Sequence, residues 1–150
     1  MKKNALLILM VISALSCRND FYTRDGGYDY TRIPFIKPYE ALMLKGSERW
    51  QMNLYNSALN SSIINIKKIN VEKNAIFLYS EDTNLDGVKV PRAWFIIIPN
   101  KHLEEGFYKE KDYLEFLKSV GLNNEPSLID INKVSDYFGR HYPINWSDIK

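Results

Sequence analysis

The feature that most restricts the fold is an apolar run near residue 95 that leaves no polar face. Residues 92–98 read Arg-Ala-Trp-Phe-Ile-Ile-Ile, so both alternating sets of positions are apolar beyond the first residue. A strand with one solvated face alternates apolar and polar residues, whereas a strand covered on both faces is apolar throughout. Pro99 and Asn100 end the run. Residues 92–98 are therefore predicted to form the most buried, central strand of a sheet.

A β-hairpin is predicted just before this strand. Residues 63–71 are rich in β-branched side chains, and the turn-forming residues 72–74 separate them from the apolar residues 75–80. Two such runs joined by a short polar turn are typical of a hairpin. The polar residues 81–89 are expected to form a loop that leads into the central strand.

Two earlier segments also have strand character. Residues 28–37 are aromatic and β-branched, but Pro34 interrupts them, and proline cannot donate to a central ladder. This segment is predicted to be an edge strand or an extended arm. Residues 49–55 alternate apolar and polar side chains, which indicates a half-buried strand paired with the segment before it.

The apolar spacing becomes helical in the last third of the chain. Apolar residues recur every three or four positions over residues 109–120, and Gly121 follows where a glycine often ends a helix. A second, shorter helix is expected between Asp130, a candidate N-cap, and Gly139. Pro143 keeps the tail non-helical.

Strands that precede helices predict an α+β fold. We expect an antiparallel sheet of about five strands, followed by one or two C-terminal helices packed on one face. The expected organisation is a leader over residues 1–17, a flexible tether over residues 18–29 and a single globular domain over residues 30–150.

The first residues have the order of a secretory signal. Lys2 and Lys3 precede an apolar stretch over residues 5–12, and small residues follow. A transmembrane helix needs about 20 apolar residues. Polar residues begin at position 18, so the stretch is too short to span a bilayer.

The end of this segment carries a further motif. Residues 14–17 read Ala-Leu-Ser-Cys, and Cys17 is the only cysteine of the chain. The segment resembles bacterial lipoprotein leaders, whose last cysteine receives diacylglycerol before cleavage. The resemblance implies cleavage just before Cys17 and a lipid anchor, palmitate included, on that cysteine. Leu15 stands one place later than the usual leucine of the family, and Ala14 with Ser16 also fits an ordinary signal peptidase site.

The expected cellular location follows from the same resemblance. The residue after Cys17 is arginine, whereas aspartate at this place favours retention in the inner membrane in the enterobacterial sorting pattern. The resemblance therefore implies a Gram-negative cell envelope and its outer membrane. Several buried acyl chains hold a protein durably, because each methylene contributes about 0.8 kcal/mol.

The mature chain also resembles small lipoproteins abundant in Bacteroidota, a group to which no chemistry is assigned. The matching stretches are Ile-Pro-Phe-Ile-Lys-Pro-Tyr at residues 33–39, Trp50, and Trp-Phe-Ile-Ile at residues 94–97.

The charge pattern disfavours nucleic acid as a partner. The leader contains two of the 20 basic residues and none of the 18 acidic ones, so the rest of the chain is formally neutral. Binding to nucleic acid needs clustered Lys and Arg that replace phosphate counterions. The expected contacts are therefore the membrane, through the lipid, and a protein partner.

One short motif resembles the start of a calcium loop. Asp82, Asn84, Asp86 and Gly87 match its alternate oxygen ligands and its glycine. The twelfth position is Ala93 rather than glutamate, and Asp, Asn and Gly are also common in hairpin loops. A plain loop is the favoured interpretation, and no metal or cofactor is expected.

No catalytic set is evident. His102 and His141 are the two histidines, and neither has metal partners at the right spacing. The leading hypothesis is a non-enzymatic module that binds a protein, for example as an immunity protein or inhibitor. The first alternative is a glycan-binding lipoprotein that uses exposed Tyr or Trp, although Trp50 and Trp94 are in phase with core residues. The second is a small hydrolase, which requires a histidine in a cleft beside a carboxylate.

Overall fold

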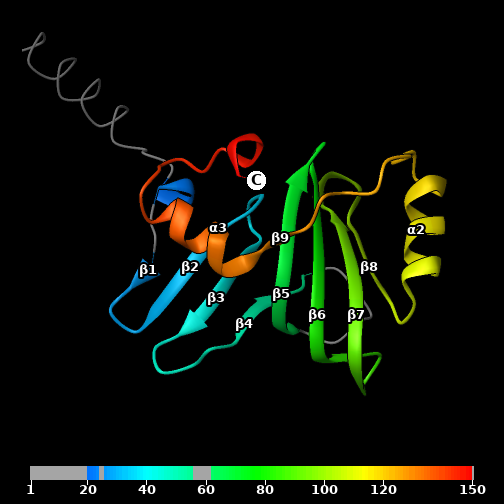
Figure 1. The fold of residues 1–150 in the computed structure, drawn as a ribbon, viewed down its shortest axis with the longest axis horizontal. Helices are drawn as coiled ribbons and strands as arrows, with labels where there is room; N and C mark the ends of the chain where they lie inside the picture. The colour runs from blue at the N-terminus through cyan, green and yellow to red at the C-terminus, as the bar shows by residue number, and fades with distance from the viewer. Residues whose placement is uncertain (1–19, 24–25, 56–61, 150) are drawn as a thin grey trace, which may run out of the picture.

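A computed structural model describes residues 20–23, 26–55 and 62–149. Its main element is one antiparallel sheet whose first eight strands lie side by side in chain order (Figure 1). These strands are β1 (Gly26–Gly27), β2 (Tyr30–Pro34), β3 (Glu40–Leu44), β4 (Trp50–Asn53), β5 (Ser62–Glu72), β6 (Ala75–Leu85), β7 (Val88–Ile98) and β8 (Leu103–Phe107). A ninth strand, β9 (Ile129–Asp130), pairs with β5. The α+β class is confirmed, but the expected count of about five strands is too low.

The region expected to be a loop over residues 81–89 is instead the end of a long hairpin. Strand β6 continues to Leu85, and Asp86 and Gly87 turn the chain with positive φ angles of 52° and 78°. Two consecutive residues with positive φ form the tight turn that fits the twist of a hairpin. The loop prediction was wrong because it rested on the many polar residues of this region. The side chains of Thr83, Leu85 and Val90, which lie among them, are buried as in a strand.

The sheet bends sharply across β5, β6 and β7. Asn65 in β5 and Asp82 in β6 both have positive φ, at 55° and 44°. The side chain of Asn65 donates a hydrogen bond to the Glu81 carbonyl, at 2.8 Å. Beyond this point the interior-facing positions of β6 change from even numbers to odd ones, while the register with β7 is kept. Such irregularities bend strands and re-aim their side chains.

Strand β8, at one edge of the sheet, contacts the segments that flank β3 and β4. Glu104 of β8 is buried, and its Oε1 accepts hydrogen bonds from the Tyr39 hydroxyl at 2.7 Å and from the Tyr55 backbone N–H at 2.8 Å. Gly106 lies under Leu85, whose Cδ1 would be 2.5 Å from a Cβ at that position. The curved sheet therefore encloses an apolar interior.

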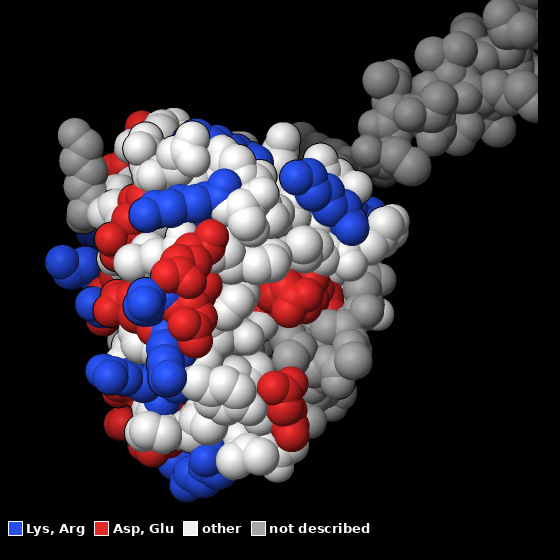
Figure 2. All heavy atoms as spheres, turned by 90° about the vertical axis from the view of Figure 1, so that its right-hand side faces the viewer, with Lys and Arg blue, Asp and Glu red and all other residues white. Residues whose placement is uncertain are grey.

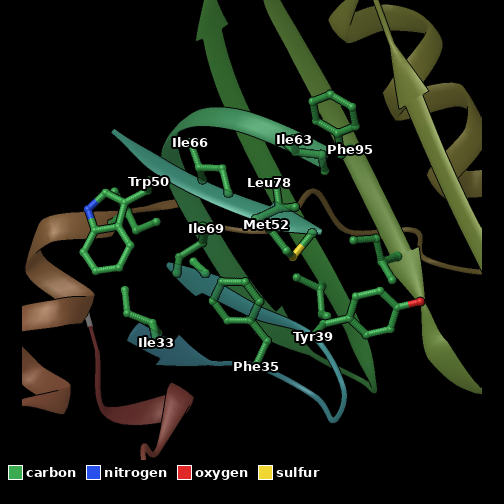
Figure 3. Close-up of a cluster of buried hydrophobic side chains, with 14 of the residues drawn as sticks. Ile33, Phe35, Tyr39, Trp50, Met52, Ile63, Ile66, Ile69, Leu78 and Phe95 are labelled. Atoms are coloured by element: carbon green, nitrogen blue, oxygen red, sulfur yellow. The ribbon is translucent and has the colours of Figure 1, made fainter. Parts of the chain in front are cut away.

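We call this interior the inner core. Large apolar side chains from β2 to β7 converge in it (Figure 3). They include Ile33, Phe35, Tyr39, Trp50, Met52, Ile63, Ile66, Ile69, Leu78 and Phe95. Trp50 is 1% exposed, as its phase in the strand predicts, and its indole N–H donates to Asn132 at 3.0 Å.

The other face of the sheet carries a second, smaller cluster, the outer core. It consists of Ala75, Phe77, Trp94, Ile96, Ile98, Tyr113 and Leu117. Because β6 and β7 contribute alternate residues to the two cores, both of their faces are covered. This confirms that residues 93–98 are buried on both faces, but β7 lies next to the edge strand β8 rather than at the centre of the sheet as predicted.

The two predicted helices exist, but they lie on opposite faces of the sheet rather than on one. Helix α2 (Glu110–Ser119) packs on the outer core, and α3 (Ile131–Phe138) packs on the inner core. Figure 1 shows α2 at the right-hand side of the molecule, beyond β8, and α3 left of β5, near β2. The reason is the curvature, since a bent sheet leaves its concave side open and α3 covers part of that opening.

The ends of the helices follow from the sequence. Gly121 has a φ of 88°, and the N–H groups of Gly121 and Leu122 donate to Lys118 and Leu117 after α2, as a C-terminal glycine permits. The carboxylate of Asp130 accepts hydrogen bonds from the N–H groups of Asn132 and Lys133 and so caps α3.

The segment expected to be a flexible tether is partly packed on the domain. A 3₁₀ turn, η1 (Asp20–Tyr22), places Phe21 against the Arg32 guanidinium, 4.9 Å from the ring centroid. Strand β1 then pairs with β2. The aromatic side chains explain the difference, because they gain more from packing than a polar tether would.

Candidate binding groove

The clearest candidate site is a groove beside the start of α2. It lies on the outer face of β6 and β7, between α2 and the segment that leads into β9, and its volume is about 560 Å³. We call it the aromatic groove. Its walls are formed by Lys68, Tyr79, Glu81, Trp94, Glu110, Glu125, Pro126, Ser127 and Leu128.

Two aromatic rings form the floor of the groove. Tyr79 and Trp94 are directly opposite each other on β6 and β7, with ring centroids 5.3 Å apart and tilted by 56°. Trp94 is 6% exposed, whereas Tyr79 is half-buried and presents part of its ring to solvent. The Arg92 guanidinium lies 5.5 Å from the centroid of the Trp94 ring. Tyr79 is therefore the ring that a ligand in the groove can contact.

Negative charge dominates the rim. Three carboxylates, those of Glu81, Glu110 and Glu125, line the groove with a single ammonium group, that of Lys68. The Tyr79 hydroxyl donates to Glu81 Oε1 at 3.2 Å. Burial raises the pKa of Tyr79, and the charge of Glu81 and its hydrogen bond raise it further, while the charge of Arg92 partly opposes the shift. The phenol therefore stays protonated at neutral pH.

The charge excess is a local property. The face of the molecule that carries α2 has acidic and basic side chains interspersed over it (Figure 2). Acidic and basic side chains are therefore mixed over this face as a whole, whereas carboxylates outnumber ammonium groups along the walls of the groove.

Backbone pairing positions the wall formed by residues 125–128. Strand β9 binds to β5 through Lys68 and Ile69, and the cap on α3 follows immediately. Pro126 is buried, which fixes the chain between α2 and β9. This pairing holds the irregular wall of residues 125–128 beside the sheet.

A second hollow, of about 700 Å³, lies between β1, β2 and the end of α3. Two arginines line it, but both interact within the chain. Arg32 forms an ion pair with Glu40, and Arg140 Nε donates to the Asp136 carbonyl at 3.1 Å. Since its cations are already engaged, this hollow is the weaker candidate.

The residues of the calcium-like motif do not form a loop. Asp82 and Asn84 lie on β6, and Asp86 lies in the hairpin turn, where its carboxylate accepts a hydrogen bond from Tyr108 at 3.1 Å. Across residues 20–23, 26–55 and 62–149, no three His, Cys, Asp or Glu side chains are grouped closely enough to hold a metal ion. Cys17, the predicted lipidation site, lies outside the described residues.

The other sequence candidates are dispersed. His102 and His141 are both exposed, and His141 stacks on Tyr137 with ring centroids 4.3 Å apart. Trp146 is half-buried, and its ring centroid lies 5.9 Å from that of Phe35. This contact packs the C-terminal tail against the inner core. The groove itself was missed from the sequence, because its walls come from five segments that share no local pattern.

Comparison with protein-family models, with characterised proteins and with solved structures found no match to this chain. Among the described residues, neither helix is long and apolar enough to cross a membrane.

Proposed function

We propose that this chain is a lipid-anchored protein of the cell envelope that binds a protein partner through the aromatic groove. The observation that carries the proposal is the half-buried Tyr79 ring on the floor of a groove that lies between the start of α2 and residues 125–128. Tyrosine contributes strongly to protein interfaces, because it offers a large contact area with little loss of conformational entropy.

The groove favours binding over catalysis. Its titratable groups are carboxylates, a lysine and a tyrosine whose pKa is raised, so the phenolate nucleophile is disfavoured. Neither histidine contributes to its walls. A hydrolase that uses His102 or His141 as a base would need that ring in a cleft, whereas both are exposed.

A glycan is the second candidate ligand, since a tyrosine ring beside carboxylates also suits a sugar. The protein partner is preferred because the tryptophan rings are covered. Trp50 and Trp94 are 1% and 6% exposed, which leaves Tyr79 as the accessible ring of the groove.

The partner is tested by quantitative capture with the full chain, tagged after residue 150 and extracted from the producing bacterium in a mild detergent. Tyr79→Ala removes the ring, and Ser127→Trp fills the groove while leaving Tyr79 in place. Tyr28→Ala is the matched control, because Tyr28 is 86% exposed at the distant β1–β2 turn.

We expect one protein to be captured by the wild type and by the Tyr28 control, and to be depleted about tenfold or more by both groove variants. Circular dichroism verifies that each variant is folded. Equal capture by all four proteins would refute the role of the groove, and capture of glycan instead of protein would favour the second candidate.

The anchor is tested separately through Cys17. The Cys17→Ala chain is expected to accumulate as an unprocessed precursor and to lose partitioning into the detergent phase, because the cysteine is the attachment point of the lipid. Normal processing and unchanged partitioning of this variant would contradict lipidation.

A further inference from the structure

We infer that the aromatic groove receives a lysine or arginine side chain of the partner protein. This inference rests on the proposed function and specifies the chemistry of the partner at this site.

Charge complementarity is the first argument. Glu81, Glu110 and Glu125 line the groove with one ammonium group, from Lys68, and the Arg92 guanidinium lies over Trp94, so three carboxylates outnumber two cations. A cation that enters this groove gains attraction from more than one carboxylate, and such complementary charge favours binding of a cationic partner.

The ring on the floor is the second argument. A cation within about 6 Å of an aromatic centroid is attracted to the electron-rich face of the ring. The Tyr79 hydroxyl donates to the Glu81 carboxylate, which adds electron density to that ring. The chain already pairs its own cations with rings of this kind, with Lys45 Nζ 3.9 Å from the Tyr28 centroid and Arg92 over Trp94.

The spacing of the carboxylates is the third argument, and it separates a side chain from a metal ion. A metal needs at least three ligands converging on one point, and the described residues contain no such group of His, Cys, Asp and Glu. Carboxylates distributed around a volume of about 560 Å³ fit an elongated side chain with an apolar stem and a charged head. Lysine and arginine have this form.

The test is isothermal titration calorimetry of the full chain in detergent with a pentalysine peptide. The same peptide with all amines acetylated, N-terminus included, is the uncharged control. The groove variant is Glu81→Gln with Glu125→Gln, which keeps side-chain size. The matched variant is Asp29→Asn with Glu48→Gln, which removes two charges from exposed residues near the first strands.

We expect saturable binding of pentalysine to the wild type, binding about tenfold weaker in the groove variant, and little change in the matched variant. Acetylation should abolish binding, and raising the salt concentration should weaken it. Binding that is absent, that survives acetylation, or that falls equally in both variants would overturn the inference.

The two proposals fail in different ways. If the captured partner depends on Tyr79 but is retained by the Glu81/Glu125 variant, the groove binds a protein without a cationic anchor, and only the inference about the side chain is overturned. If pentalysine binds through the carboxylates but no protein is captured through Tyr79, the groove is a cation site and the proposed protein-binding function is overturned.

Discussion

Tyr113 places a polar hydroxyl group in an apolar environment. It lies on α2 and is 2% exposed in the outer core, and its hydroxyl has no hydrogen-bond partner among the described residues. Burying a hydroxyl without a partner is unfavourable by about 1–3 kcal/mol. The aromatic ring is what the outer core needs at this position, and the hydroxyl is tolerated.

The Tyr113→Phe variant is therefore expected to unfold at a urea concentration equal to or above that of the wild type, with a gain of up to about 1 kcal/mol at neutral pH. Burial raises the pKa of Tyr113, and the charges of Glu125 and Glu72 add to this. A raised pKa in the folded state leaves stability constant below the ordinary tyrosine pKa of about 10 and reduces it as the pH rises further.

The same variant should consequently lose less stability than the wild type between neutral and strongly alkaline pH. Urea unfolding of both proteins at about pH 7 and about pH 11 measures the difference. A variant that is clearly less stable than the wild type at neutral pH would show that the hydroxyl has a stabilising partner.

At the scale of single elements, the cap on α3 has a measurable role. Helix α3 has only eight residues, so its first turn is a large part of it. The Asp130→Ala variant is expected to lose about 1 kcal/mol, because the N–H groups of Asn132 and Lys133 lose their acceptor. Chemical denaturation measures the loss, and Asp136→Ala, an exposed position on the same helix, is the control. Equal losses in both variants would indicate that charge, rather than capping, matters.

Elements with a strong local signal could be predicted from the sequence. Helices α2 and α3, the β5–β6 hairpin and the buried strand β7 follow from apolar spacing, turn residues and caps. Strand β8 has only a short pattern, and β1 and β9 have two residues each, so tertiary pairing rather than composition decides them. The end of β6 was misread because Glu81 and Asp82 are adjacent polar residues at the bend, which breaks the alternation.

At the scale of the whole molecule, the curvature of the sheet determines where the helices pack, and the sequence does not show this curvature. A flat sheet of this order would keep β3 and β8 far apart, and both helices could pack on one face. The strands are irregular at Asn65 and Asp82, and α3 and α2 pack on opposite faces of the curved sheet. The aromatic groove exists because α2 covers only part of that face, so it could not be derived from any single segment.

One buried carboxylate connects β8 with the segments that flank β3 and β4. Glu104 accepts hydrogen bonds from Tyr39, which precedes β3, and from the backbone of Tyr55, so it joins segments 65 and 49 residues away. A hydrogen bond to a charged, buried acceptor contributes about 1.5–3 kcal/mol, more than a bond between neutral groups. Its loss should affect the whole domain, because Tyr39 also lies in the inner core (Figure 3).

Tyr39→Phe is therefore expected to lower the free energy of unfolding by about 1.5–3 kcal/mol while the aromatic packing is kept. Tyr28→Phe is the matched control, since that side chain is 86% exposed and should change stability by less than about 0.5 kcal/mol. Urea denaturation followed by tryptophan fluorescence measures both. If the hydrogen bonds of Glu104 hold β8 against the segments beside β3, amide exchange in β3 and β8 should accelerate together in Tyr39→Phe. Acceleration in β3 alone would mean that the bond stabilises only the strand next to Tyr39.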